Sequence, residues 1–173
     1  MGVIINGTRD MSQNLKLAFY LGEKHRNPKS TLLDQVICYA TRSPYSHVEL
    51  VYHFEESTNT ASCWSSSAPD KGVRRKDIVL HPERWELYEL HNKKPSDEMQ
   101  AWFAQQNGKP YDYFGAIGTK FFIFRQDRHK WFCSEIIAYY LKHHRPHRQS
   151  PHQLYKTNFR NMTKIELQKR SYP

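Results

Sequence analysis

The sequence predicts an α+β domain in which a mainly antiparallel sheet packs against helices. Two observations support this fold class: short runs of alternating apolar and polar residues are typical of strands, and helical spacing of apolar residues occurs on either side of them. At 173 residues the chain is long enough for one substantial core but short for two domains. We therefore expect one domain over 1–173, with a loose N-terminus at 1–13 and a C-terminal extension at 157–173.

Most predicted strands lie in the first half of the chain. The clearest one runs from His47 to Phe54, because apolar residues alternate there with polar ones and give the strand two different faces. The other expected strands are 15–21, 60–66 and 85–90, with turns at 55–59 and 70–72.

Helices are predicted where apolar residues recur at helical spacing behind a capping residue. Ser30 is a suitable cap for the first helix, and Ser150 with Gln153 has the spacing of a capping box. The expected helices are 30–41, 97–106, 113–122, 133–143 and 150–156.

Cys133 stands at the first turn of a predicted helix, where it is a candidate nucleophile. A helix N-terminus carries partial positive charge and unpaired N–H groups, which stabilise a thiolate. The Cys133 N–H itself can help to hold a developing oxyanion. The alternative is a buried, inert cysteine, which is common.

His47 and Glu49 lie two residues apart on a predicted strand, so both side chains project to one face. This spacing suits a carboxylate that orients an imidazole and stabilises its charged form. The alternative is an edge strand with two solvated polar groups. Another orienting group could come from the neighbouring strand, at Ser62, Trp64 or Ser66.

Cys38 and Cys63 are weaker candidates, because they lie within an apolar helix face and inside a strand. Both are expected to be structural. Three cysteines cannot all pair internally, and their spacing fits neither a disulfide framework nor a zinc motif. Without a recognisable secretory signal or membrane-spanning stretch, we expect a protein kept in a reducing cytoplasm.

The chain is strongly basic, with a formal net charge of +9. Basic runs at 74–76 and 164–170 could bind an anionic polymer, although ordinary surface charge explains them equally well. The histidine-rich segment 143–152 lacks carboxylates or cysteines at ligand spacing, so a solvated basic loop is expected there. We expect no metal site and no cofactor.

Three segments in order resemble the circularly permuted branch of the NlpC-type papain-like superfamily. They are Ser-His-Val-Glu-Leu at 46–50, Pro-Tyr-Asp-Tyr-Phe-Gly at 110–115 and Phe-Cys-Ser-Glu at 132–135. In that branch the histidine strand precedes the cysteine helix. The resemblance covers about 32–155 and implies a papain-like, permuted NlpC-type fold with the nucleophile at a helix N-terminus.

The resemblance implies Cys133 as nucleophile, His47 as base and Glu49 as a third member, with Tyr111 near the catalytic centre as an oxyanion or substrate-positioning group. The implied function is a thiol hydrolase that cleaves an amide bond as a peptidase or amidase, and cell-wall peptides are the commonest substrate. A bacteriophage or other viral source, acting in the host cytoplasm, would reconcile that substrate with the missing signal.

Two other functions remain open. The same site could catalyse acyl transfer or lipid-ester hydrolysis, as in permuted relatives similar to lecithin:retinol acyltransferase. A basic module that binds polyanions without catalysis is the third hypothesis, and it predicts strongly salt-dependent binding. The sequence does not choose between amide and ester substrates.

Overall fold

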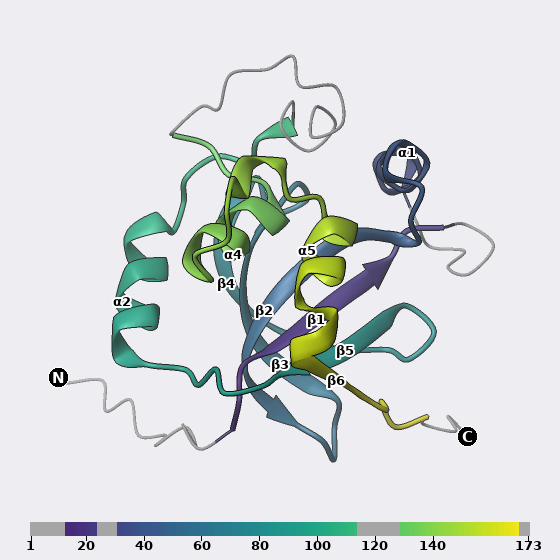
Figure 1. The fold of residues 1–173 in the computed structure, drawn as a ribbon, viewed down its shortest axis with the longest axis vertical. Helices are drawn as coiled ribbons and strands as arrows, with labels where there is room; N and C mark the ends of the chain where they lie inside the picture. Colours follow the sequence, from purple (N-terminus) through teal and green to yellow (C-terminus); the bar gives the residue numbers. More distant parts are fainter. Residues whose placement is uncertain (1–12, 24–30, 114–128, 170–173) are drawn as a thin grey trace, which may run out of the picture.

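The computed structural model of the protein describes residues 13–23, 31–113 and 129–169. They form an α+β domain around an antiparallel six-stranded sheet with the strand order β4-β3-β2-β1-β5-β6 (Figure 1). The strands are β1 (Lys16–Leu21), β2 (Tyr45–Glu55), β3 (Thr60–Ser67), β4 (Gly72–Val79), β5 (Trp85–Leu90) and β6 (Met162–Ile165). The helices are α1 (Leu32–Thr41), α2 (Asp97–Gln106), α4 (Cys133–Tyr140) and α5 (Pro151–Asn158), with single 3-10 turns at Pro146–Arg148 and Phe159–Asn161.

The main hydrophobic core lies between one face of the sheet and the helices. It combines alternate residues of β2, such as Val48 and Leu50, with apolar residues of all four helices, among them Ile37, Phe103 and Ile136. Figure 1 shows α4 and α5 lying across the sheet on this side. A smaller cluster that contains Val51 and Cys63 lies on the opposite face. β2 is therefore covered on both faces.

A β-bulge at the start of β2 adjusts the strand next to His47. Tyr20 pairs with His47 and Leu21 pairs with Tyr45, so Ser46 is the extra residue. The Ser46 hydroxyl donates to Asp34 of α1 at 2.7 Å. Gly22 packs against the bulge so closely that an added Cβ would lie 2.5 Å from the Ser46 Cβ. The bulge fixes where His47 enters the sheet.

The strands predicted near 15–21, 47–54, 60–66 and 85–90 are confirmed, but β4 and β6 were not expected. β4 pairs with β3 along its whole length, although its sequence has the charged character of a loop. β6 comes from the segment that was predicted to be an extension. Both strands are edges of the sheet, where charged residues are tolerated and apolar alternation is weak.

The helices agree with the predictions except at their ends. Ser30, the expected first cap, lies outside the described residues, and Thr31 caps α1 through a capping box with Asp34. α4 ends at Tyr140 rather than near residue 143, because Lys142 adopts a left-handed conformation that stops the helix. The proposed helix at 113–122 and the loose N-terminus lie almost wholly outside the described residues.

Candidate active site

Cys133 is the first residue of α4, and its side chain is buried. The N-cap residue, Phe132, has no side-chain group that could bind the N–H groups of the first turn. Two hydroxyls hold the chain around it: Ser66 donates to the Trp131 carbonyl at 2.6 Å, and Ser134 donates to the Gln149 carbonyl at 2.5 Å. The thiol is therefore fixed at the positive end of a short helix.

His47 and Glu49 contact each other directly on β2. His47 Nε2 lies 2.7 Å from Glu49 Oε1. The Glu49 side chain is only 1 % exposed and that of His47 18 % exposed. The solvated edge strand considered from the sequence is wrong, because β2 is an interior strand and Glu49 is enclosed.

The other partner of His47 is Cys133, whose thiol lies within hydrogen-bonding reach of the imidazole. Burial opposes the charged imidazolium, but the negative charges of Cys133 and Glu49 outweigh it and raise the pKa of His47 from 6.5 to about 10. Because Nε2 faces Glu49, Nδ1 is the ring nitrogen left for the thiol. The geometry suits a thiolate–imidazolium pair oriented by a carboxylate.

Arg74 is a member of the site that the sequence did not identify. Its guanidinium reaches from β4 across β3 and binds both carboxylate oxygens of Glu49, at 2.6 and 2.7 Å. Although burial favours the neutral acid, Arg74 and His47 hold the pKa of Glu49 well below its usual value. Asp70 accepts from Arg74 Nε at 2.8 Å and from Lys76 at 2.9 Å, so charges alternate from the interior to the surface.

Arg74 was assigned from the sequence to a basic surface run, and that assignment is wrong. A signal for its true position was available in principle, because a carboxylate on a buried strand requires a cation or several donors. Finding that cation required the pairing of β3 with β4, in which Ser65 lies opposite Arg74.

Tyr111 lies close to Cys133 because its segment pairs with the chain that leads into α4. Tyr111 forms an isolated bridge with Trp131, and the Asp112 N–H donates to the Trp131 carbonyl at 2.9 Å. Burial and the nearby charge of Cys133 raise the pKa of the Tyr111 phenol well above its usual value. The phenol therefore stays protonated and can act as a hydrogen-bond donor.

The remaining sequence candidates are engaged elsewhere. Trp64 donates to Gln100 at 2.8 Å, Ser66 binds Trp131, and Ser62 lies opposite His53 on β2. Glu49 is the group that contacts His47.

Cys38 and Cys63 are both free thiols and both buried. Burial, with smaller contributions from acidic neighbours, raises the pKa of Cys38 to about 12. Burial and the nearby Glu49 raise the pKa of Cys63 well above its usual value. Neither environment favours a thiolate.

A cavity of about 490 Å³ opens beside His47. One part of its wall is apolar, with Leu33 and Ile37 from α1 and Trp85 from β5. The other part carries the series of ion-paired side chains that runs from Glu49 through Arg74 and Asp70 to Lys76. Tyr111 also lines this cavity. A substrate in this cavity would meet both an apolar surface and the imidazole.

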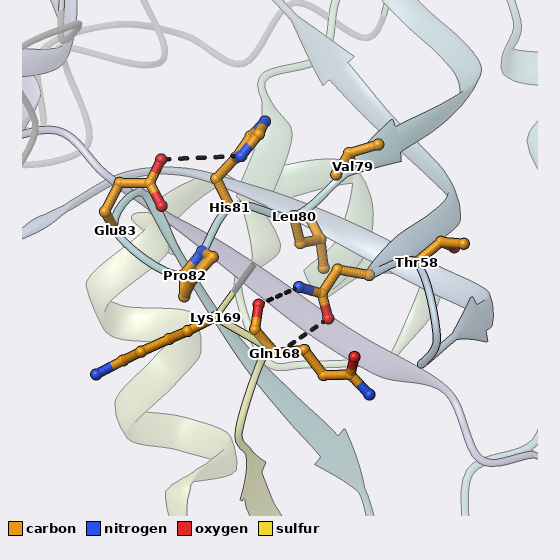
Figure 2. Close-up of a pocket in the computed structure, with 9 residues that line it drawn as sticks. Thr58, Val79, Leu80, His81, Pro82, Glu83, Gln168 and Lys169 are labelled. Carbon is orange, nitrogen blue, oxygen red and sulfur yellow. Dashed lines mark hydrogen bonds and ion pairs between the residues drawn. The ribbon is translucent and has the colours of Figure 1, made fainter. Parts of the chain in front are cut away.

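A second cavity, of about 480 Å³, lies between the β2–β3 turn and the C-terminal segment (Figure 2). His81 and Glu83 point toward each other there, 3.8 Å apart. Asn59 exchanges two hydrogen bonds with the backbone of Gln168, at 2.8 and 3.1 Å. No cysteine is among the described residues that line this cavity, and the Asn59 side chain there holds the C-terminal segment.

Within 13–23, 31–113 and 129–169, no three His, Cys, Asp or Glu side chains are arranged to hold a metal ion. In the same ranges no helix has both the length and the apolar character needed to cross a bilayer. Comparison with known proteins gave no match to any family model, any curated protein or any solved structure.

Proposed function

We propose that this protein is a cysteine hydrolase that cleaves an amide bond through a thioester on Cys133. The observation that carries the proposal is the continuous contact from the thiol through His47 to the buried carboxylate of Glu49. A thiol at a helix N-terminus beside an imidazole of raised pKa has what a nucleophile requires.

In the first half of the reaction, the Cys133 sulfur attacks the substrate carbonyl carbon and a C–S bond forms. The Cys133 backbone N–H and the Tyr111 hydroxyl stabilise the oxyanion. The His47 imidazolium then gives its proton to the leaving nitrogen, the C–N bond breaks, and an amine departs.

In the second half, neutral His47 accepts a proton from water, and the resulting hydroxide attacks the thioester carbonyl. The C–S bond breaks, the thiolate is restored and a carboxylic acid leaves. Glu49 holds the imidazole orientation in both halves, and Arg74 holds Glu49 in its ionised form.

The apolar wall of the cavity beside His47 supports a second candidate, acyl transfer or ester hydrolysis by the same residues. An apolar acyl group fits Leu33, Ile37 and Trp85 as well as a peptide side chain does. The first half-reaction is unchanged apart from an oxygen leaving group. An alcohol or amine takes the place of water when the acyl group is transferred.

A papain-like fold of the circularly permuted NlpC type is part of this proposal. It is supported by the order of the elements, because the His47 strand precedes the Cys133 helix, and by the antiparallel sheet behind them. It leads us to cell-wall peptides as the first amide substrates for testing.

The test is the rate of alkylation by iodoacetamide, followed by intact mass from about pH 5 to about pH 9. We expect fast alkylation well below the pKa of about 8.5 that a free thiol has, and we expect it to vanish in Cys133→Ala. In His47→Ala the pH at which alkylation becomes fast should rise, because the cation that stabilises the thiolate is gone.

Cys63→Ala is the matched control, since it removes another buried thiol from the same site and should leave the alkylation profile unchanged. Slow alkylation that persists in Cys133→Ala would contradict the proposal. Once the thiol is established, paired amide and ester substrates with one acyl group decide between the two chemistries.

A further inference from the structure

The C-terminal end of α4, away from Cys133, lines a cavity of about 600 Å³ that the proposed reaction does not use. Its walls come from α2, from the segment before α2 and from the residues that end α4. We call it the lysine–tryptophan pocket and define it by the six residues Lys93, Lys94, Glu98, Trp102, Tyr139 and Lys142.

Two aromatic rings from different helices are stacked in this pocket. The Trp102 ring of α2 and the Tyr139 ring of α4 lie 5.7 Å apart with an angle of 11° between their planes. Trp102 also packs edge-on against Phe103, which is fully buried, so the stack is anchored in the core. The Tyr139 side of the stack is open, because Tyr139 is 51 % exposed.

The charge of the pocket is predominantly positive. Lys93, Lys94 and Lys142 are all exposed and converge from two separate segments, against the single carboxylate of Glu98. None of these lysines forms an ion pair with a carboxylate in the described part of the chain. Three cations that find no carboxylate partner among the described residues, beside an open aromatic stack, are not needed to hold α2 against α4.

We propose that the lysine–tryptophan pocket binds single-stranded nucleic acid. A base extends the stack by lying on the exposed Tyr139 ring, and the flanking phosphates bind the lysines on either side, which is the arrangement that single-strand binding requires. Glu98 would repel a phosphate but can accept a hydrogen bond from an exocyclic amino group on a base edge. A concave site also fits a nucleotide better than it fits the flat surface of a bilayer.

This binding does not depend on the chemistry of Cys133, because the described residues that line the lysine–tryptophan pocket and those that line the cavity beside His47 have no member in common. Failure of the proposed hydrolase activity would leave the nucleic-acid proposal standing, and the reverse also holds.

The test is fluorescence anisotropy of a short labelled oligodeoxycytidylate over a series of salt concentrations. Lys93→Gln with Lys142→Gln should weaken binding about 10-fold and make the log–log salt slope shallower by about 1.4, because each phosphate contact on a single strand contributes roughly 0.7. Tyr139→Ala should weaken binding about 5-fold or more through the loss of one stacked base.

The matched control is Lys156→Gln with Lys169→Gln, which removes two exposed lysines outside the pocket. It should change binding less than about 3-fold. Thermal midpoints equal to wild type show that each variant is folded. Absence of saturable binding by wild type at low salt would overturn the proposal, as would equal weakening in pocket and control variants or no effect of Tyr139→Ala. Phosphatidylserine vesicles that displace the oligonucleotide and lose binding in the same variants would assign the pocket to lipid instead.

Discussion

Cys133 and Cys63 are both buried and lie at opposite ends of the same pair of residues, His47 and Glu49. Cys133 adjoins the imidazole, whereas Cys63 lies near the carboxylate and donates its S–H to the Lys76 carbonyl at 3.2 Å. Burial, the negative charge of Glu49 and a hydrogen bond with Glu49 raise the pKa of Cys63, and the nearby Arg74 opposes them only in part. Cys133 instead adjoins the His47 imidazole at the start of α4, so the two buried thiols differ in the group beside each sulfur and in their place on a strand or at a helix N-terminus.

The largest expected effect separates the two thiols directly. A limiting amount of electrophile should label Cys133 alone in the folded protein, and Cys63 should react only after unfolding in urea. Cys133→Ala should abolish turnover, whereas Cys63→Ala should retain it at a cost of about 1 kcal/mol of unfolding free energy for one buried heavy atom. Peptide mapping of the labelled protein measures this, and early labelling of Cys63 would refute the comparison.

Arg74→Met tests the carboxylate that lies between the thiols. It leaves Glu49 buried with His47 as its main partner, so we expect the free energy of unfolding to fall by about 3–5 kcal/mol, as it does when one partner of a buried ion pair is removed. Urea denaturation at neutral pH gives the value. Arg75→Met, at the next position of β4, is the control, because Arg75 is exposed and contacts the Tyr52 ring at 5.9 Å. Equal losses in both variants would mean that Arg74 contributes only packing.

Tyr111→Phe removes a hydroxyl from the Cys133 end only. We expect turnover to fall by about 10²–10³, the cost of one oxyanion donor, while the alkylation rate of Cys133 stays near that of wild type. The split between turnover and alkylation is the informative result. A parallel fall in both rates would show that Tyr111 instead supports the geometry of the thiol.

Glu49→Gln keeps the shape of the side chain, and its effect on pH dependence acts through the pKa of His47. In wild type that pKa is raised from 6.5 to about 10, so the imidazolium persists below about pH 10 and is lost above it. The stability it contributes is therefore fully present below pH 6.5 and decreases as pH rises through about 10. Removing the Glu49 charge should lower the pKa of His47 and move the alkaline loss of stability and activity to lower pH.

Denaturation midpoints and rates measured across this alkaline range provide the check. Glu89→Gln serves as the control, because Glu89 is a carboxylate on β5 that binds Lys16 and Asn14. If stability and activity are lost at the same high pH in Glu49→Gln as in wild type, Glu49 does not set the charge state of His47.

Most of the fold could be predicted from the sequence, because a strand or helix that buries one face has apolar residues at periodic positions. The alternation in β2 and the cap at Ser150 are local features, and both are confirmed. β4 and β6 could not be predicted, because an edge strand derives its structure from its neighbour rather than from its own pattern.

For the candidate site, the sequence by itself determined that Cys133 begins a helix and that His47 and Glu49 share one face of a strand. Both are consequences of backbone geometry over a few residues. Only the tertiary structure decided that the imidazole meets the thiol, that β2 is interior, and that Arg74 neutralises Glu49. Charge pairing between strands depends on register, and register is fixed by the whole sheet and its bulges rather than by any single segment.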